Sequence, residues 1–247
     1  MICLAAFMCS AALFATILQH PASPLRIATS DAWIARAPMG LAMGLTAIAI
    51  IYSPIGRRSG AHMNPAVTLT FLRLGKIAPF DAAAYILAQF AGGIAGIVAT
   101  TVLLAGLPAD PSVNYVATLP GPAGASVAFV AEVTISAGMM LAILSVSSHP
   151  RLNRLTGLCA GTLVFIYITV EAPLSGMSMN PARSFGPALL AGALDSLWVY
   201  FTAPLLGMLL AAHIFVRRRG VAYVPCAKLD HAPEVPCIFC LHHEVSQ

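Results

Sequence analysis

Long apolar stretches alternate along the chain with short breaks that are polar or rich in Pro and Gly. A helix needs about 20 mostly apolar residues to cross a hydrocarbon core of roughly 30 Å. The pattern therefore predicts an all-α membrane protein with six transmembrane helices. We place these helices at about 2–18, 37–55, 82–105, 125–147, 156–174 and 196–216.

The composition agrees with this prediction. Of the 247 residues, 59% are hydrophobic and 9% are charged, whereas a soluble domain has about 45–50% apolar and about 25% charged residues. A chain with so few polar groups cannot cover a water-exposed surface, which excludes an ordinary soluble monomer. We expect the lipid bilayer to be a partner of this protein, and we expect no nucleic-acid partner.

Two further apolar segments, 64–74 and 180–190, are too short to cross a bilayer, and each begins with Asn-Pro-Ala. Asn is a strong N-cap, and Pro suits the first helical turn because the N–H that it lacks would have no helical partner there. Both segments are therefore predicted to be half-helices that re-enter the membrane from a loop.

The residues around these half-helices form an internal repeat. Positions 59–66 read SGAHMNPA and positions 175–182 read SGMSMNPA, so six of the eight residues are identical at an offset of 116. Each copy follows two predicted spans and precedes a third, so the second half enters the membrane from the opposite side. Inverted repeats with short apolar segments indicate a pathway at the repeat interface. We divide the chain into a first repeat (1–115), a second repeat (125–216) and a tail (217–247).

The positive residues favour one orientation. Cytoplasmic loops carry an excess of Lys and Arg, and with both termini in the cytoplasm only Arg26 and Arg36 lie in outer loops. We therefore predict an integral multi-pass protein of the cell membrane, plasma or inner, with both termini and the tail in the cytoplasm. The cytoplasmic positive residues are then Arg57, Arg58, Arg73, Lys76, Arg151, Arg154, Arg217, Arg218, Arg219 and Lys228.

Two half-helix N-termini that meet in the membrane produce a particular electrostatic environment. A helix N-terminus carries partial positive charge and unpaired N–H donors, so a narrow passage between two of them opposes cations and protons. A neutral dipole such as water can pass. A water molecule held by both Asn side chains donates its hydrogens outward, which interrupts a proton-conducting chain.

These paired motifs resemble those of the major intrinsic protein family, the aquaporins and glycerol facilitators, and the resemblance covers about residues 1–216. The resemblance implies an aquaporin-like fold of six tilted helices and two re-entrant half-helices, and a homotetramer with one pore in each subunit. It assigns the pore motifs to Asn64, Pro65, Ala66, Asn180, Pro181 and Ala182.

The same resemblance assigns a selectivity filter. Arg183, three residues after Asn180, matches the filter arginine, and an Arg within the membrane is functional by default. Met43 takes the aromatic position of the second span if Met43-Gly44-Leu45 is aligned with the aromatic-Gly-Leu pattern, whereas counting back twenty residues from Asn64 selects Gly44. Ile168 replaces the His of strict water channels, and Met177 is the remaining filter residue.

Two polar residues are predicted to support the loops that precede the half-helices. Glu132, inside the fourth span, is expected to accept N–H bonds from the second loop, although a proton relay or an ion ligand is the alternative. His62 is expected to pack within the first loop rather than to gate the pore. The first span offers no matching Glu, because Ile2 or a residue before Met1 occupies that position.

The tail carries a separate group of candidate metal ligands: Cys226, Cys237, Cys240 and His242. A Cys-x-x-Cys motif with a nearby His can form a tetrahedral zinc site. The alternative is a disordered tail with reduced thiols. We expect no other cofactor.

We interpret the chain as a passive channel for water, with other small neutral solutes as further substrates, and not as an enzyme. The first alternative is an aquaglyceroporin-like channel for glycerol, hydrogen peroxide, ammonia or metalloid acids, which the apolar filter favours and which Ser184 and Tyr200-Phe201 disfavour. An ion-coupled transporter needs a titratable group at the membrane midplane, where Glu132 is the one deep candidate. A metal-sensing homologue with a closed pore is the third alternative.

Overall fold

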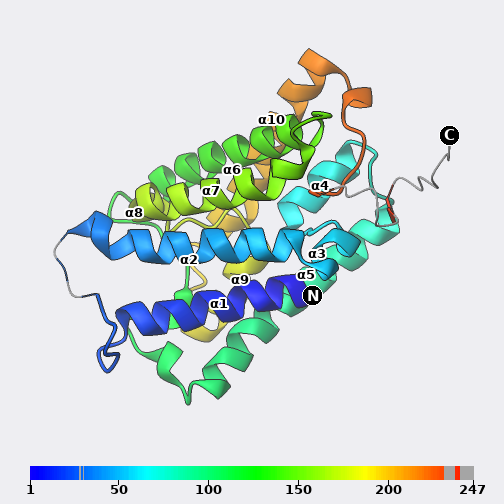
Figure 1. Ribbon diagram of the computed structural model, residues 1–247. Coiled ribbons are helices and arrows are strands. Elements are labelled where there is room, and N and C mark those ends of the chain that lie inside the picture. The colour runs from blue at the N-terminus through cyan, green and yellow to red at the C-terminus, as the bar shows by residue number, and fades with distance from the viewer. Residues whose placement is uncertain (28, 30, 231–236, 240–247) are drawn as a thin grey trace.

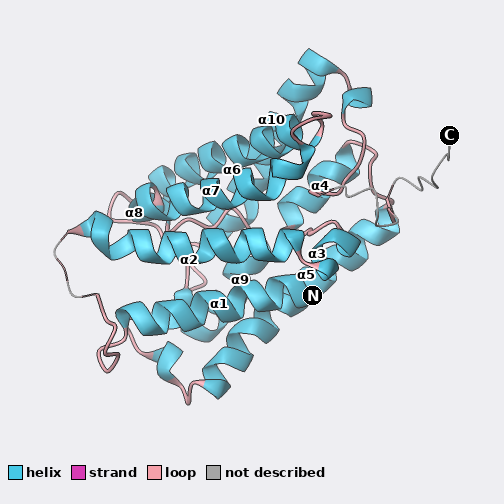
Figure 2. Ribbon diagram, viewed as in Figure 1, coloured by secondary structure: helices cyan, strands magenta, loops and turns pink. Residues whose placement is uncertain are grey.

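The computed structural model describes residues 1–27, 29, 31–230 and 237–239, and the described chain is helical without strands (Figures 1 and 2). Six of its helices are long and apolar enough to cross a membrane, which confirms the predicted fold class. These helices are α1 (Ile2–Gln19), α2 (Ala32–Tyr52), α5 (Pro79–Leu103), α6 (Ala125–Ser147), α7 (Thr156–Val170) and α10 (Leu197–Arg219). Short 3-10 turns lie at Leu107–Ala109 (η1), Asn114–Val116 (η2), Asn153–Leu155 (η3) and Val221–Tyr223 (η4).

Helix α2 lies nearer the N-terminus than the predicted span 37–55. Its N-cap is Asp31, whose carboxylate accepts hydrogen bonds from the backbone N–H groups of Trp33 and Ile34. The helix ends at Tyr52 because Pro54, two residues later, cannot continue it. Asp31 and Pro54 therefore place both ends of this helix earlier in the chain than the hydrophobic pattern predicted.

Two short half-helices form where the Asn-Pro-Ala motifs predicted them, α4 (Pro65–Arg73) and α9 (Pro181–Ala191). Each is preceded by a still shorter helix that the hydrophobic pattern did not predict, α3 (Pro54–Ser59) and α8 (Ala172–Ser175). Helices α3 and α8 lie at opposite ends of the bundle (Figure 1). The two half-helices are therefore approached from opposite ends.

The long helices pack in pairs, α2 against α7, α6 against α10 and α1 against α5. Glycines permit the closest of these approaches. A Cβ atom added to Gly44 would lie 2.6 Å from the carbonyl oxygen of Gly161, and one added to Gly161 would lie 2.6 Å from the carbonyl oxygen of Gly44. The α2–α7 contact therefore requires a residue without a side chain on both helices.

The chain turns back toward the bundle after α10 (Figure 1). Residues 224–230 pack against the loop between α3 and α4, and most of their side chains are buried. The alternative of a disordered tail is wrong for this segment, because apolar residues such as Val224 and Leu229 are buried in the main hydrophobic cluster.

Candidate pore

A cavity of about 360 Å³ extends through the bundle between the two repeats. Its lining on α2 begins at Ala35 and ends at Ile51, which at 1.5 Å per residue corresponds to roughly 24 Å of helix. This length approaches the thickness of a hydrocarbon core. Both motif residues Asn64 and Asn180 line the cavity, as do the predicted filter residues Met43, Ile168, Met177 and Arg183.

The two motif asparagines cap their own half-helices. The Asn64 side-chain oxygen accepts a hydrogen bond from Ala66 N at 2.9 Å, and the Asn180 oxygen accepts from Ala182 N at 3.1 Å and Arg183 N at 3.2 Å. Pro65 and Pro181 occupy the first helical positions, and Ala66 and Ala182 are fully buried behind them.

The same asparagines also connect the two repeats. Asn64 Nδ2 donates to the carbonyl oxygen of Met179 at 2.6 Å, and Asn180 Nδ2 donates to the carbonyl oxygen of Met63 at 2.8 Å. These reciprocal bonds hold the two half-helix N-termini close together. An amide nitrogen has two hydrogens, so each Nδ2 retains a second N–H at the cavity that both residues line.

The backbone before each half-helix repeats its conformation as well as its sequence. Gly60 and Gly176 have φ values of +73° and +77°, and the next residues, Ala61 and Met177, also lie in the left-handed region. Glycine adopts this conformation without steric cost, which explains its presence at both positions.

The second loop is bound to Glu132. This buried carboxylate accepts hydrogen bonds from Ser178 N at 2.6 Å, Met179 N at 2.7 Å and Ser175 Oγ at 2.8 Å. Three donors and two oxygens match an ionised carboxylate, which offers only acceptors. Glu132 therefore satisfies backbone N–H groups that would otherwise be buried without partners.

The first loop is held by residues that the sequence did not single out for this role. Tyr85 OH donates to Ser59 O at 2.8 Å, and Tyr200 OH makes the equivalent bond to Ser175 O at 2.6 Å in the second repeat. Gln89 Nε2 donates to His62 O at 2.6 Å. The tyrosines recur at nearly the repeat offset, a signal that an alignment of the two halves could have found.

His62 is buried within this first loop. Its ring stacks on Phe71 of α4, with 5.3 Å between the centroids, and its Nε2 lies 2.7 Å from the carbonyl oxygen of Ala227 in the tail. Since a carbonyl only accepts, Nε2 carries the proton. His62 thus joins the loop to the tail.

Arg183 lies one turn into α9 and reaches across to η2 and the segment that follows it. Its Nη1 donates to Val116 O and to Thr118 Oγ1, both at 3.0 Å. Thr118 Oγ1 in turn lies 2.6 Å from Ser184 Oγ. These contacts fix the guanidinium beside the cavity, so Arg183 does not extend to the membrane surface.

A family model described as "Major intrinsic protein" matches residues 2–215 of this sequence. The chain belongs to the major intrinsic protein family. This match confirms the family that the Asn-Pro-Ala motifs indicated.

Plant aquaporins are among the similar proteins. "Probable aquaporin NIP7-1" from Arabidopsis thaliana is 38% identical over 168 residues, covering 68% of this chain and 59% of that protein. "Aquaporin NIP1-2" from Arabidopsis thaliana is 35% identical over 182 residues, covering 72% and 61%. The matches thus span about three fifths of the length of these relatives.

Among solved structures, the fold is similar to that of the aquaglyceroporin from Plasmodium falciparum, with a TM-score of 0.69. The two chains are 18% identical, and the match covers 87% of this chain and 91% of the other. At 18% sequence identity, this structural similarity shows the fold alone.

The wall of this major intrinsic protein's cavity is rich in methionine. The lining of α2 faces inward at Met39, Met43, Ala47 and Ile51, which are spaced one helical turn apart. Gly44 instead contacts α7, so of the two filter candidates on α2 the cavity is lined by Met43. Seven of the ten methionines line the cavity: Met39, Met43, Met63, Met139, Met177, Met179 and Met208.

The predicted zinc site falls partly outside the described residues. Cys226 and Cys237 are buried, with their sulfur atoms 3.2 Å apart, whereas Cys240 and His242 lie in the part of the tail that the structure does not describe. Within the described ranges, no group of three or more His, Cys, Asp or Glu residues is placed to hold a metal ion. The zinc site stays a prediction.

Proposed function

We propose that this protein is a passive channel for water and other small neutral solutes. The observation that carries the proposal is the meeting of α4 and α9 at the cavity, where Asn64 and Asn180 cap the two helices and bind across to the opposite repeat. The N–H groups at the centre of this pathway can donate hydrogen bonds to the oxygen atom of a neutral solute, which can therefore pass.

The same arrangement opposes cations and protons. Both half-helix N-termini carry partial positive charge, and Arg183 adds a full positive charge to the cavity wall. A cation would lose hydration there without finding a compensating acceptor. A water molecule that accepts from both Asn residues directs its hydrogens away from the centre, so proton transfer along the water chain is interrupted.

The predicted filter residues favour the passage of a wider range of solutes than a strict water channel admits. Met43, Ile168 and Met177 contribute apolar side chains to the cavity that Arg183 also lines, and Met is flexible and adapts to irregular shapes. This observation favours the second candidate function, an aquaglyceroporin-like channel for glycerol, hydrogen peroxide, ammonia or metalloid acids. No bond is made or broken in either case, so neither function requires a catalytic residue or a cofactor.

We further propose that both termini face the cytoplasm of the cell membrane and that four copies associate, each with its own pore. The orientation rests on the excess of Lys and Arg at one end of the spans. The tetramer rests on the family resemblance, and native mass spectrometry of the detergent-solubilised protein tests it.

Stopped-flow light scattering of proteoliposomes tests the channel function. An impermeant osmolyte should cause shrinkage faster than that of protein-free liposomes, and glycerol reswelling separates the two candidate functions. Flux that requires an ion gradient would support a coupled transporter instead.

A pair of variants on α2 locates the pathway. Met43→Trp places a large ring in the cavity and should lower the water flux by at least about fivefold, because permeation depends on the open width of a pore. Leu45→Trp places the same ring on the exposed side of the same helix and should leave the flux unchanged. Equal flux through both variants would show that water does not cross through this cavity.

A further inference from the structure

Residues 224–230, here called the C-terminal strap, are packed tightly although they follow the last spanning helix. Val224 and Ala227 are inaccessible to solvent, and even the charged residues Lys228 and Asp230 are only 2% and 4% exposed. Charged side chains are rarely buried to this extent unless they have partners. The strap is therefore an integral part of the folded protein.

Three contacts fix the strap to the α3–α4 region. Leu229 N donates to Gly60 O at 3.3 Å, and His62 Nε2 donates to Ala227 O at 2.7 Å. Arg57 Nε of α3 donates to Asp230 Oδ2 at 2.9 Å. The three partner residues lie on α3 and on the loop immediately before Asn64. The strap is therefore bound to the segment that leads to the pore centre.

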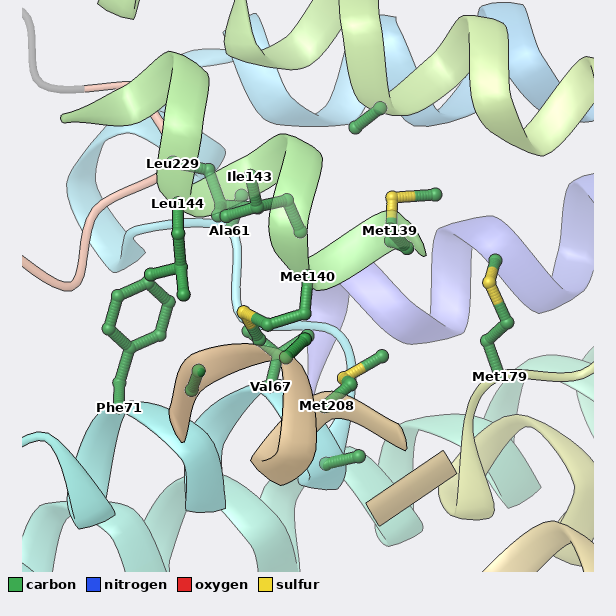
Figure 3. Close-up of a cluster of buried hydrophobic side chains, with 14 of the residues drawn as sticks. Ala61, Val67, Phe71, Met139, Met140, Ile143, Leu144, Met179, Met208 and Leu229 are labelled. Carbon is green, nitrogen blue, oxygen red and sulfur yellow. The ribbon is translucent and has the colours of Figure 1, made fainter. Parts of the chain in front are cut away.

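One strap residue reaches the cavity itself. Leu229 lines the same cavity as Asn64, and it belongs to one cluster of buried side chains with Ala61 and Ile143. Figure 3 shows these three side chains together near one end of the cluster. Ile51, the last α2 residue of the lining, also belongs to this cluster. We call the end of the cavity at Ile51, Ala61 and Leu229 the inner mouth.

We propose that the C-terminal strap is a built-in plug that closes the inner mouth of the pore. This inference rests on the proposed channel function. Leu229 supplies the apolar stopper, the Arg57–Asp230 ion pair holds it in position, and withdrawal of the strap opens the pathway. The protein is then a channel whose resting permeability depends on the fraction of molecules with the strap released.

A charge-swap experiment on the full-length protein tests the plug. Asp230→Lys places two positive charges at the Arg57 contact without changing the cavity lining, and it should raise the water permeability per channel at least about fivefold, since permeability follows the open population. Arg57→Glu should have the same effect. The double variant Arg57→Glu/Asp230→Lys restores an ion pair and should return the permeability toward that of the wild type.

Two further variants complete this experiment. Asp195→Lys makes the same charge change at an exposed loop position and should leave the permeability unchanged. Leu229→Gly removes the stopper but leaves the ion pair, and should raise the flux even if a charge variant fails to fold. Equal, measurable flux in wild type, Asp230→Lys and Leu229→Gly would overturn the plug alone. Absence of flux from every folded variant would overturn the channel function itself.

A different observation points to a covalent site in the same region. The buried thiols of Cys226 in the strap and Cys237 lie with their sulfur atoms 3.2 Å apart. Phe239, two residues after Cys237, stacks on His62 with 5.5 Å between the centroids. A bond between the two thiols would join both parts of the tail that cover the first loop.

We infer that Cys226 and Cys237 form a disulfide under oxidation by a peroxide. The two S–H bonds break and one S–S bond forms, so the thiols lose two protons and two electrons; hydrogen peroxide takes up both, its O–O bond breaks, and two water molecules leave. A disulfide that forms in a reducing compartment is usually transient and serves catalysis or redox sensing. The oxidised pair fixes the strap and favours the closed pore.

Peptide mapping of the full-length protein after peroxide treatment tests this site. The expected product is a linked peptide pair containing Cys226 and Cys237, in the wild type and in a Cys240→Ser variant, with lower water flux that a thiol reductant restores. Cys226→Ser should abolish both effects, whereas Cys159→Ser should retain them. A Cys237–Cys240 linkage, or tight zinc binding that protects both thiols from peroxide, would overturn this inference.

Discussion

Replacement of Glu132 by Gln is the most direct test of how the second half-helix is held in position. The side chains have nearly the same shape, but Gln replaces one acceptor oxygen by an NH2 donor. Glu132 now accepts from Ser178 N, Met179 N and Ser175 Oγ at 2.6–2.8 Å. In the variant at least one of these donors faces another donor.

The expected cost follows from these bonds. A hydrogen bond to a charged group contributes about 1.5–3 kcal/mol, and a buried donor left without a partner costs about 1–3 kcal/mol. Removal of a buried charge offsets part of this loss. We expect a net loss of roughly 2–4 kcal/mol in the free energy of unfolding, which corresponds to a decrease of about 6–12 °C in Tm for a chain of this size.

Thermal unfolding in a mild detergent, followed by tryptophan fluorescence or circular dichroism, measures this decrease. Ser175→Ala removes the hydroxyl donor to this carboxylate and should cost about 1.5–3 kcal/mol. Asp195→Asn makes the same carboxylate-to-amide change at an exposed position and should shift the unfolding free energy by less than about 0.5 kcal/mol.

The variant should also impair selectivity, because Asn180 and Arg183 directly follow the loop that Glu132 holds. We expect glycerol to enter proteoliposomes that contain the variant faster than proteoliposomes that contain the wild-type protein. A Glu132→Gln protein as stable as the Asp195→Asn control would refute the reasoning that this carboxylate anchors the loop.

Three other predictions concern the filter, the first loop and the helix packing. Arg183→Val removes a guanidinium held at 3.0 Å by Val116 O and Thr118 Oγ1, so glycerol and urea should enter proteoliposomes faster, and unchanged solute selectivity would remove Arg183 from the filter. Burial lowers the pKa of His62, in the loop outside the six spanning helices, to about 4. Below pH 6.5 the unfolded chain gains a proton at His62 that the folded protein does not, so the free energy of unfolding should fall by about 2 kcal/mol on acidification to pH 5. His62→Gln should remove this part of the pH dependence of Tm. Gly161→Leu places a side chain where even an added Cβ would clash with Ile48 Cγ1, and it should cost roughly 3 kcal/mol. Ala49→Leu on the exposed side of α2 should cost little, and similar Tm values for the two variants would contradict the close α2–α7 packing.

The sequence by itself determined the features that depend on local chemistry. Long apolar runs predicted six spanning helices, and Asn-Pro-Ala predicted two half-helix N-termini, because capping and hydrophobicity act within a few residues. The 116-residue repeat indicated that these termini belong to equivalent positions in two halves. The family resemblance assigned Arg183 to the filter, and an Arg within a membrane segment is functional by default.

Only the tertiary structure decided how these elements contact one another. Met43 rather than Gly44 lines the cavity because Gly44 is used for the contact with α7. The partners of Arg183 come from a loop more than sixty residues earlier, and Leu229 reaches the cavity from beyond the last spanning helix. These contacts join residues that are distant in the chain, and their geometry depends on the packing of the whole bundle, which hydrophobic periodicity does not encode.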